Sequence, residues 1–476
     1  MTKSVRQSKK SDRILSGNMT STILIIALPI LFYNVCNYLY GIYDMMIVQI
    51  ADIGDAADVV VLDQIKNMIQ TLGGAIATGG GILIAKKIGE KDLPGAKKSA
   101  NTLFTMALII ASVTLLFIPF AVPFLKLLRT DKTTIDNALG YFDVQMLNLF
   151  IMTLNVCFIA IEKSKGNTLR IFIMNLGVIV IKISLTTLFA FGPFDGVTIT
   201  WLAVATTIAQ LFMMIMMIIF SILPSNPLRL TIKSLNLNKA NLKAIIKLSL
   251  PIFIGRFLFH FGKVYLNSIA TVKYGKKVVG ALGISNTMAG LPTNMINSFE
   301  DGGSTIVSQN YGSGNGRRIK KFYVINMIMV SSIALVSLIT LFILKSQVAS
   351  FFAGNDEEYK EYIVTIFRWE CLDVFFTGIA GASNAIFYGF GKTKITSSMS
   401  MVNLFGFRLP TLMLLMYVVK MNYEACGVAM FVSNTAAGII TFLLCLVFML
   451  RIEKNNKYKG LFEKNNLTNL EEVTVS

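Results

Sequence analysis

Long uninterrupted apolar runs constrain the fold of this 476-residue chain more than any other feature of its sequence. Two examples are the runs from Met106 to Phe124 and from Leu202 to Leu223. Each is long enough to cross about 30 Å of hydrocarbon as an α-helix. A bilayer offers no water to backbone groups, so a spanning segment must be a helix or a strand of a closed barrel, and barrel strands alternate polar and apolar residues. The runs therefore predict an all-α integral membrane protein.

The apolar runs and the turn signals between them predict twelve transmembrane helices in two six-helix bundles. The expected spans are residues 20–50, 59–86, 96–128, 137–162, 169–192, 196–224, 243–272, 278–310, 319–345, 358–388, 393–420 and 424–451. The most polar connection, SNPLRLTIKSLNLNKANLKAIIK, begins at Ser225 and has the composition of a linker. We expect a cytoplasmic basic tail (1–18), an amino-terminal bundle (19–224), a cytoplasmic linker (225–242), a carboxy-terminal bundle (243–451) and a cytoplasmic tail (452–476).

The excess of basic residues, a formal charge of +18, is distributed in a way that predicts the orientation of the chain. Lysine and arginine are concentrated in the amino-terminal tail and in alternate connections, such as those from Lys86 to Lys98 and from Arg317 to Lys321. This is the positive-inside pattern of a membrane protein, whereas a nucleic-acid-binding protein carries its basic residues on one face of a domain. We therefore expect a multi-pass protein of the plasma (inner) membrane with both termini in the cytoplasm and no nucleic-acid partner.

The two halves of the chain resemble each other, which predicts an internal repeat. A Leu-Pro pair that ends at Pro29 recurs with its proline at Pro251, an offset of 222 in the numbering. The basic connection IAKKIGEKDLPGAKK corresponds to IVSQNYGSGNGRRIKK, with Gly89 matching Gly312 at an offset of 223. Because both halves are expected to begin in the cytoplasm, the repeat is parallel, and transporters with repeats bind substrate at the repeat interface. The sequence therefore predicts two pseudo-symmetric bundles.

Three segments together resemble the multidrug and toxic-compound extrusion (MATE) family of antiporters. The first span, IALPILFYNVCNYLYGIYDMMIV, resembles the family's opening helix, in which a proline precedes a membrane-embedded aspartate, as Pro29 precedes Asp44 here. The tenth span, WECLDVFFTGIAGASNAIFYGFGKTK, resembles the segment with the family's second buried carboxylate, and Asp373 falls on it. The connection IVSQNYGSGNGRRIKK is similar to the one that follows the family's eighth span.

The resemblance implies a secondary active transporter that exports drugs or other small organic compounds, expected to be cationic, from the cytoplasm in exchange for H+ or Na+. The expected partners are this small-molecule substrate and membrane lipid, and the expected state is a monomer. The chain departs from the family at Phe259 and His260, where some members carry a glutamate, and at Lys182 and Thr186, where asparagines are common. The mode of ion coupling is therefore not carried over from the family.

Charged side chains inside the predicted spans are the candidate ion-coupling and substrate-binding residues. A charge at bilayer depth costs about 2.5–3.5 kcal/mol, so such residues are rare and tend to mark ion or substrate routes. The candidates for ion coupling are Asp44, Asp373 and Glu370, of which the last two share one helix face. A carboxylate in a dry bundle can take up a proton, a sodium ion or a cationic drug in mutually exclusive states. The residues expected to line a cavity are Asn34, Lys182, His260, Glu300, Asp301 and Arg408.

Structural roles remain open for several of these residues. Asp44 could simply pair with Lys182, which would weaken the hypothesis of proton coupling because a fixed cation favours the ionised carboxylate. Arg408 or Arg368 could likewise neutralise the carboxylates of the tenth span. The adjacent acidic pair of the eighth span either lines the cavity or caps a helix break at the two glycines that follow.

Other functions also remain open. A flippase for an anionic lipid-linked precursor, from the same superfamily, would favour basic residues such as Lys182 and Arg408 in its cavity. A non-transporting structural or receptor membrane protein would have fully paired buried charges and a solid interior. An enzyme is not indicated, because the chain has one histidine, no HExxH motif and no glycine-rich phosphate loop. The five cysteines lie in predicted spans without paired spacing, so we expect no metal site and no cofactor other than the coupling ion.

Overall fold

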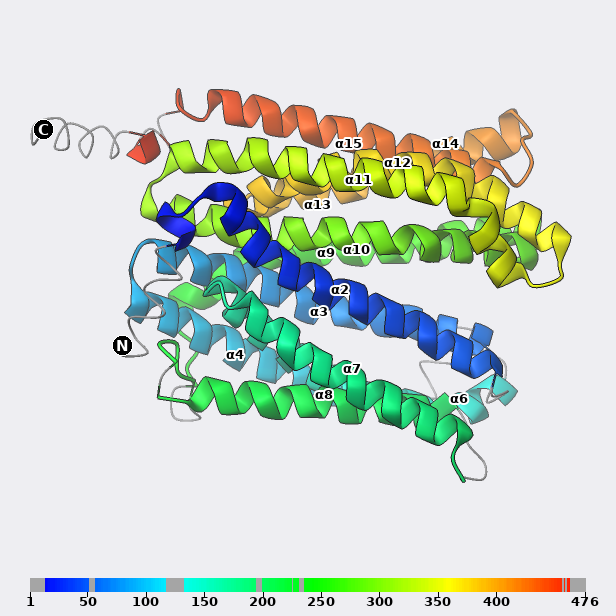
Figure 1. Ribbon diagram of the computed structural model, residues 1–476, viewed down its shortest axis with the longest axis horizontal. Helices are drawn as coiled ribbons and strands as arrows, with labels where there is room; N and C mark the ends of the chain where they lie inside the picture. The colour runs from blue at the N-terminus through cyan, green and yellow to red at the C-terminus, as the bar shows by residue number, and fades with distance from the viewer. Residues whose placement is uncertain are drawn as a thin grey trace, which may run out of the picture. The chain divides into compact units, whose positions relative to one another are not determined.

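A computed structural model of the protein describes residues 13–50, 56–116, 132–193, 199–224, 226–230, 235–455, 458 and 460–462. These residues are almost entirely helical (Figure 1). The helices of the first half are α2 (Met19–Ile50), α3 (Ala56–Gly89), α4 (Leu93–Leu115), α6 (Lys132–Ser164), α7 (Thr168–Phe191) and α8 (Ile199–Ile222). Those of the second half are α9 (Lys239–Tyr274), α10 (Lys276–Ser313), α11 (Gly316–Ala353), α12 (Glu357–Gly389), α13 (Thr393–Met401), η3 (Val402–Arg408), α14 (Leu409–Met413), η4 (Leu414–Val418) and α15 (Ala425–Arg451).

The run from α13 to η4 is a single helical rod, so the part of the chain that the structure describes contains twelve long helices. This confirms the predicted all-α fold of twelve helices. Most helix bounds lie within a few residues of the predicted spans; α9, for example, covers residues 239–274 where 243–272 was expected. The first twelve residues of the basic tail and the end of the predicted third span, 117–128, lie outside the described residues.

Eight of the described helices are long and apolar enough to cross a bilayer. The long helices outside this group are α3, α9, α10 and α12. Among them, α9, α10 and α12 carry several of the charged and amide side chains of the site described below. A spanning helix with charged residues turns them toward the protein interior, because lipid cannot solvate them. The chain is therefore a multi-pass membrane protein with a polar interior.

The chain forms two compact units that cut across the halves of the sequence. Among the described residues, unit 1 comprises residues 32–253, and unit 2 comprises residues 13–31 together with those from 254 onward. The division falls inside α2 and α9, shortly after Pro29 and Pro251. Proline has no N–H and its ring clashes with the carbonyl four residues earlier, so it weakens a helix at that point. The start of each half's first helix is thus packed within the unit formed mainly by the other half.

Glycines allow these exchanged helix starts to pack closely. A Cβ atom on Gly79 of α3, in unit 1, would lie 3.0 Å from the backbone nitrogen of Ser249 in α9. A Cβ atom on Gly302 of α10, in unit 2, would lie 3.4 Å from the Cα atom of Ala27 in α2. The two glycines are related by an offset of 223 in the numbering, and their partners by an offset of 222. The same contact therefore occurs at corresponding positions of the repeat.

Caps and turns at the helix ends also recur in the two halves of the chain, at nearly the same offset in the numbering. Asp92 caps α4 and Asn315 caps α11; each side chain accepts a hydrogen bond from the backbone N–H three residues on, at 2.8 and 3.2 Å. Gly166 and Gly391 precede α7 and α13 with φ angles of 76° and 68°. This left-handed conformation favours glycine because it has no Cβ. The offset between the halves is 223 at the caps and 225 at these turns.

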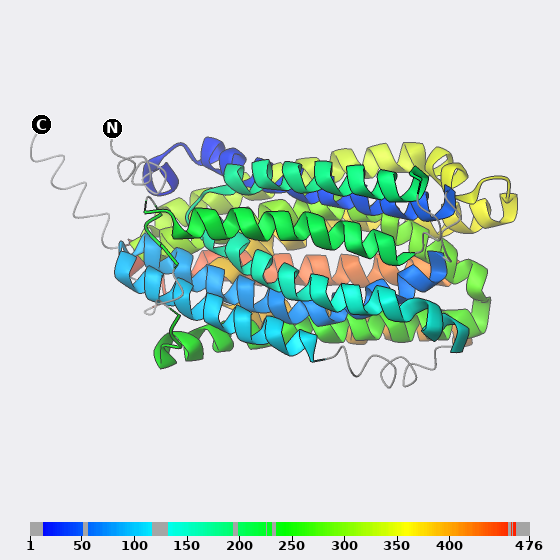
Figure 2. The ribbon, with the colours of Figure 1, turned by 90° about the horizontal axis from the view of Figure 1, so that it is seen from below.

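The two units also pack their helices in the same way. In unit 1, α6 contacts α3, α4 and α8, and in unit 2, α12 contacts α10, α11 and α15. These helices correspond in the repeat, so α6 and α12 are the central helices of their units. The neighbours α7 and α8 of unit 1 run side by side in two perpendicular views (Figures 1 and 2). The two pseudo-symmetric bundles predicted from the sequence are therefore present in the fold.

The rod from α13 to η4 differs from its counterpart α7 in having π-helical segments. In η3, the N–H of Leu409 donates to the carbonyl of Leu404, five residues back. The next residue is Pro410, whose ring would clash with the carbonyl of Gly406 in a regular α-helix. Widening the turn relieves this clash, and a π turn holds one additional residue. The offset between the halves therefore increases from 225 before η3 to 226 at its end.

Candidate functional site

The interior of unit 2 contains two buried carboxylates on α12. Glu370 and Asp373 are 4% and 3% exposed and lie one helical turn apart. Glu370 accepts a hydrogen bond from the hydroxyl of Ser285 on α10, and Asp373 Oδ2 accepts one from Asn434 Nδ2 on α15 at 2.7 Å. Neither carboxylate forms an ion pair with any residue that the structure describes. Both are therefore held by neutral partners.

Asn434 connects Asp373 to a buried guanidinium group. Arg408 Nη2 donates to Asn434 Oδ1 at 2.8 Å, and Arg408 Nε donates to Ser433 Oγ at 3.0 Å. Asn403 Nδ2 also donates to Asn434 Oδ1, at 3.0 Å. Arg408 is the last residue of η3, so the widened turn before Pro410 sets its position. The cation thus reaches the carboxylate through an amide rather than by direct contact.

Close packing of α12 against α15 fixes the distance between Asp373 and Asn434. A Cβ atom on Gly427 would lie 2.7 Å from a backbone carbonyl oxygen of α12, and one on Gly438 would lie 2.6 Å from another. These distances leave no room for a side chain at either position. Asn434 lies between the two glycines in α15. The glycines therefore hold the two helices close enough for the hydrogen bond between Asn434 and Asp373.

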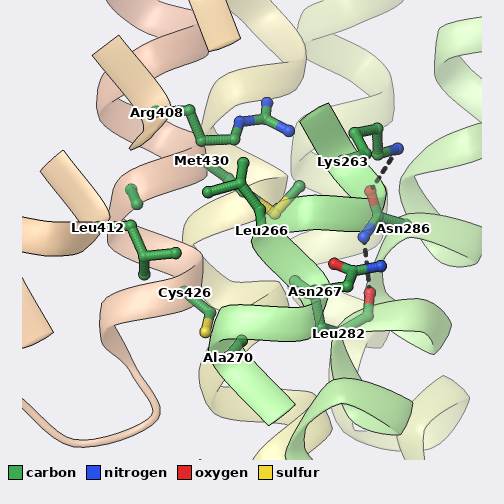
Figure 3. Close-up of a pocket in the computed structure, with 11 residues that line it drawn as sticks. Lys263, Leu266, Asn267, Ala270, Leu282, Asn286, Arg408, Leu412, Cys426 and Met430 are labelled. Atoms are coloured by element: carbon green, nitrogen blue, oxygen red, sulfur yellow. Dashed lines mark hydrogen bonds between the residues drawn. The ribbon is translucent and has the colours of Figure 1, made fainter. Parts of the chain in front are cut away.

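A small pocket with a volume of ≈ 30 Å³ lies beside this network (Figure 3). Its lining residues are Lys263, Leu266, Asn267, Ala270, Leu282, Asn286, Arg408, Leu412, Cys426, Ala429 and Met430. They include two basic side chains and no acidic one. Figure 3 shows Arg408 and Lys263 at one end of the pocket, with Leu412 and Cys426 toward the other. The pocket therefore has a cationic end and an apolar end.

The positive charge of Lys263 in this pocket is only weakly compensated by the groups that contact it. Lys263 Nζ donates to Asn286 Oδ1 at 3.5 Å, which exceeds the usual hydrogen-bond length of about 2.7–3.2 Å. The ring centroid of Phe259 lies 5.9 Å from Lys263 Nζ and 5.9 Å from Arg408 Cζ. Within the described part of the chain, neither basic residue forms an ion pair. An amide and an aromatic face are the direct contacts of the ammonium group.

Unit 1 holds its buried charges by direct contact. Lys182 Nζ on α7 lies 3.0 Å from Asp44 Oδ2 on α2, and their side chains are 2% and 25% exposed. Lys182 Nζ also donates to the carbonyl oxygen of Leu202, at 3.1 Å. The ion pair considered as an alternative from the sequence is therefore present in the structure. A ligand that binds Asp44 must compete with Lys182 for the carboxylate.

The repeat relates the basic residues of the two units. Lys182 is the fourteenth residue after Thr168, where α7 begins, and Arg408 is the fifteenth after Thr393, where α13 begins. The additional residue is the one that the π turn of η3 inserts. Lys182 and Arg408 therefore occupy corresponding positions, at an offset of 226.

The acidic residues, in contrast, do not correspond. At an offset of 225, Glu370 and Asp373 match Gln145 and Asn148 of α6, whose buried amides hydrogen-bond to each other at 3.1 Å. At the offset of 222 that relates the two Leu-Pro pairs, Asp44 of α2 matches an apolar residue of α9, namely Leu266. The repeat thus keeps the basic position and places the carboxylates on different helices in the two units.

The remaining predicted residues lie outside this pocket. Asn34 is half-buried on α2, and His260 is half-buried on α9 with its ring nearly perpendicular to that of Phe259, 6.3 Å between the ring centroids. Glu300 on α10 accepts a hydrogen bond from Asn384 at 3.4 Å. Asp301 follows it in the same helix, and α10 continues without interruption through the next two glycines. The alternative that this acidic pair caps a helix break is therefore wrong.

Arg368 does not neutralise the buried carboxylates. It pairs with Glu424 at the start of α15, and the indole of Trp369 donates to the same carboxylate at 2.7 Å. The neutral groups that do contact Glu370 and Asp373, on Ser285 and Asn434, were not among the predicted residues, which apart from Asn34 were all titratable. The signal for Asn434 in the sequence is a polar residue within the otherwise apolar span of α15.

Comparison with known proteins identifies the family of the chain. The family model MatE matches residues 29–188 and 251–414, one segment in each half of the sequence. This chain belongs to the MatE family. The two MatE segments begin at Pro29 and Pro251, the prolines that mark the repeat. The resemblance to the multidrug and toxic-compound extrusion family is thereby confirmed.

Individual MatE relatives are distant in sequence and close in fold. The multidrug export protein MepA of Staphylococcus aureus (strain MRSA252) is 22% identical over 293 residues, which are 61% of this chain and 64% of MepA. The outward-facing structure of a multidrug resistance MATE family transporter of the MOP superfamily has a TM-score of 0.87 at 18% identity, covering 93% of this chain and 98% of that one. A MOP superfamily transporter from Pyrococcus furiosus Vc1, described as having a binding pocket of reverse polarity that suggests a different function, matches with the same TM-score, identity and coverage.

Proposed function

We propose that this MatE protein is a secondary active transporter that exports drugs or other small organic compounds from the cytoplasm in exchange for H+ or Na+. The observation that carries the proposal is the pair of buried carboxylates in unit 2, Glu370 and Asp373, each with a neutral hydrogen-bond partner. A buried charge without a direct counter-charge is unfavourable, and a bound proton or sodium ion relieves it. This pair can therefore alternate between ion-loaded and empty states, as exchange requires.

The proposal gives the two units different roles. Glu370 and Asp373 bind the coupling ion in unit 2. Asp44 in unit 1 is one-quarter exposed and paired with Lys182, so a cationic substrate could displace the lysine from it. The family membership and the multidrug export function named for MepA support export of small organic compounds, and the carboxylate of Asp44 supports a cationic one. We further propose a monomer in the plasma membrane with both termini in the cytoplasm, in accordance with the distribution of basic residues.

The test is gradient-driven export from proteoliposomes of the purified protein. Either a pH gradient or a sodium gradient is imposed, and efflux of a panel of cationic and anionic compounds is measured for the wild type, Asp44→Asn and Asp373→Asn. We expect export of cationic compounds under one of the two gradients and its loss in Asp373→Asn. Undiminished gradient-driven export by both variants would contradict the proposed coupling. An absence of flux for every compound in the wild type would favour a receptor or structural role.

A flippase for an anionic lipid-linked precursor is the second candidate. The buried Lys182 and Arg408 and the half-buried Lys263 favour it, since basic side chains suit an anionic headgroup. The binding pocket of reverse polarity described for the Pyrococcus furiosus neighbour supports considering this alternative for a protein of the same fold. The proteoliposome assay also distinguishes the two candidate functions, because a flippase moves an anionic lipid between leaflets and does not export the cationic compounds.

A further inference from the structure

We infer that the pocket between Lys263 and Arg408 binds a small monovalent anion, either a halide or a small carboxylate. The inference rests on the proposed transport function and deepens it, because it adds an anionic ligand to the unit that carries the coupling carboxylates. Three features of unit 2 support it. They are the sparse contacts of the two cations, the correspondence with unit 1, and the size of the pocket.

The first feature is the shortage of acceptors around the two cations. A guanidinium group has five N–H donors, and the hydrogen bonds of Arg408 go from Nε to Ser433 and from Nη2 to Asn434. Within the described residues, the ammonium group of Lys263 donates one hydrogen bond, of 3.5 Å to Asn286, and its other neighbour is the ring of Phe259. Buried charges are normally paired, because desolvation of an isolated cation is strongly unfavourable. An anion in the pocket could accept hydrogen bonds from both side chains.

The second feature is the corresponding arrangement in unit 1. There, the base on α7, Lys182, lies 3.0 Å from the carboxylate of Asp44 on α2. Unit 2 retains the base as Arg408, but α9 carries Leu266 at the position of the aspartate. Leu266 and Arg408 both line the pocket. The pocket is thus bordered by the residue that replaces the carboxylate, and a free anion would restore the missing partner.

The third feature is the size and polarity of the pocket. Its volume of ≈ 30 Å³ is far below the roughly 300–1,000 Å³ of pockets that enclose drug-sized ligands. The amides of Asn267 and Asn286 lie at its wall, and Leu412 and Cys426 form its apolar end (Figure 3). Neither Glu370 nor Asp373 lines it. The space suits one small anionic group with little attached to it.

The experiment measures thermal unfolding of the purified full-length protein without any ion gradient. Sodium chloride and sodium formate are titrated against sodium gluconate, with sodium concentration and ionic strength held equal, since gluconate is too large for the pocket. We expect a saturable rise of the unfolding midpoint with chloride or formate, as ligand binding to the folded state requires. A stronger response to chloride identifies a resident halide. A stronger response to formate identifies a site for a small carboxylate.

Matched variants localise the response to the pocket. Leu266→Asp supplies a tethered carboxylate and is expected to abolish the anion response, whereas the neutral Leu266→Asn is expected to retain it. Lys263→Met and Arg408→Gln are expected to remove the response. Lys273→Met, on the same helix but beside Tyr417, is expected to keep it. If these variants misfold, chlorine NMR line broadening by the wild type, reversed by formate, provides the decisive measurement.

The inference is overturned if chloride and formate stabilise the wild type no more than gluconate does and cause no line broadening. It is equally overturned if folded Leu266→Asp retains the saturable anion response. Because binding is measured without transport, intact drug export in a protein that binds no anion would contradict only this inference. Anion binding by a protein that exports nothing would contradict only the proposed function.

Discussion

Units 1 and 2 place a basic side chain at corresponding positions and compensate its charge by different means. In unit 1, Lys182 contacts the carboxylate of Asp44 directly, at 3.0 Å. In unit 2, Arg408 reaches the carboxylate of Asp373 only through the amide of Asn434. A direct pair tends to keep both charges in place, whereas a carboxylate bound to an amide can gain or lose a cation without breaking an ion pair. The two units therefore differ in whether a ligand of the carboxylate must first displace a basic side chain, as at Asp44, or meets no ion pair, as at Asp373.

The central helices show the same contrast. Gln145 and Asn148 on α6 are the uncharged counterparts, in size and shape, of Glu370 and Asp373 on α12. The amides bind each other and cannot bind a proton or attract a metal ion as a carboxylate can. A duplicated scaffold can therefore keep the size and shape of its polar side chains while one copy alone retains acids at this position.

The substitution Asp373→Asn is expected to have the largest effect, a loss of transport. The amide has the shape of the acid but cannot take up the coupling ion, so gradient-driven export in proteoliposomes should fall to the background level. Because no ion pair is broken, unfolding should shift little. The matched control is Asp356→Asn, at an exposed position, which should export like the wild type. Wild-type export by Asp373→Asn would remove the functional distinction between the units.

The substitution Asp44→Asn in unit 1 is expected to have the next largest effect, a loss of folding stability. This change removes the carboxylate from Lys182, whose side chain is 2% exposed, and breaking a buried pair in this way costs about 3–5 kcal/mol. The double variant Asp44→Asn with Lys182→Met should recover most of that loss, because it leaves no unpaired charge. Thermal or detergent-induced unfolding of the two single variants and the double variant measures this coupling. Additive effects would show that the pair acts as two independent groups.

A smaller effect is expected from Gly438→Ala in unit 2. The new Cβ atom would lie 2.6 Å from a carbonyl oxygen of α12, and relieving that clash should cost about 1–3 kcal/mol. It should also lengthen the hydrogen bond between Asn434 and Asp373. Gly283→Ala on α10 is the control, since nothing lies within 4 Å of its Cβ position. Unfolding midpoints compare the two variants, and equal midpoints would contradict the close packing of α12 and α15.

The smallest expected effect comes from exposed charges, which provide a reference for the buried ones. Lys277 donates to Asp356 at 3.1 Å and to Glu358 at 2.6 Å, and these contacts lower the pKa of both carboxyl groups. A lowered folded-state pKa means that the stabilisation is present above about pH 4, where free carboxyl groups titrate, and is lost as the pH falls through the folded-state values. In Lys277→Met this part of the pH profile should flatten slightly. An unchanged profile would show that the cluster does not contribute to stability.

Local patterns were sufficient to predict the helices. A bilayer requires each spanning segment to form its own backbone hydrogen bonds, so the apolar runs and the turn signals between them locate the helices, as they did for α7 and α15. The compact units were not predicted in this way. Pro29 and Pro251 were interpreted as markers of a repeat, whereas the division of the chain falls shortly after them, inside the helices.

The candidate site was predicted less completely because its partners depend on tertiary packing. The sequence indicated Asp373 and Arg408 as buried charges, but the amide of Asn434 between them comes from another helix, at a position set by glycine packing. The correspondence of Arg408 with Lys182 was also hidden, since the π turn shifts the repeat by one residue at that point. Pro410 was the local signal of that shift.

The division of α2 and α9 has a consequence for the order in which the protein can be completed during synthesis. Unit 1 needs residues up to 253, so it is unfinished when the ribosome has passed the linker at 225–242. Unit 2 contains residues 13–31, which are synthesised before unit 1, and residues from 254 onward, which are synthesised after it. A chain cut within the linker would yield two fragments, neither of which contains every part of one unit. Such fragments must exchange their helix starts before either unit is whole.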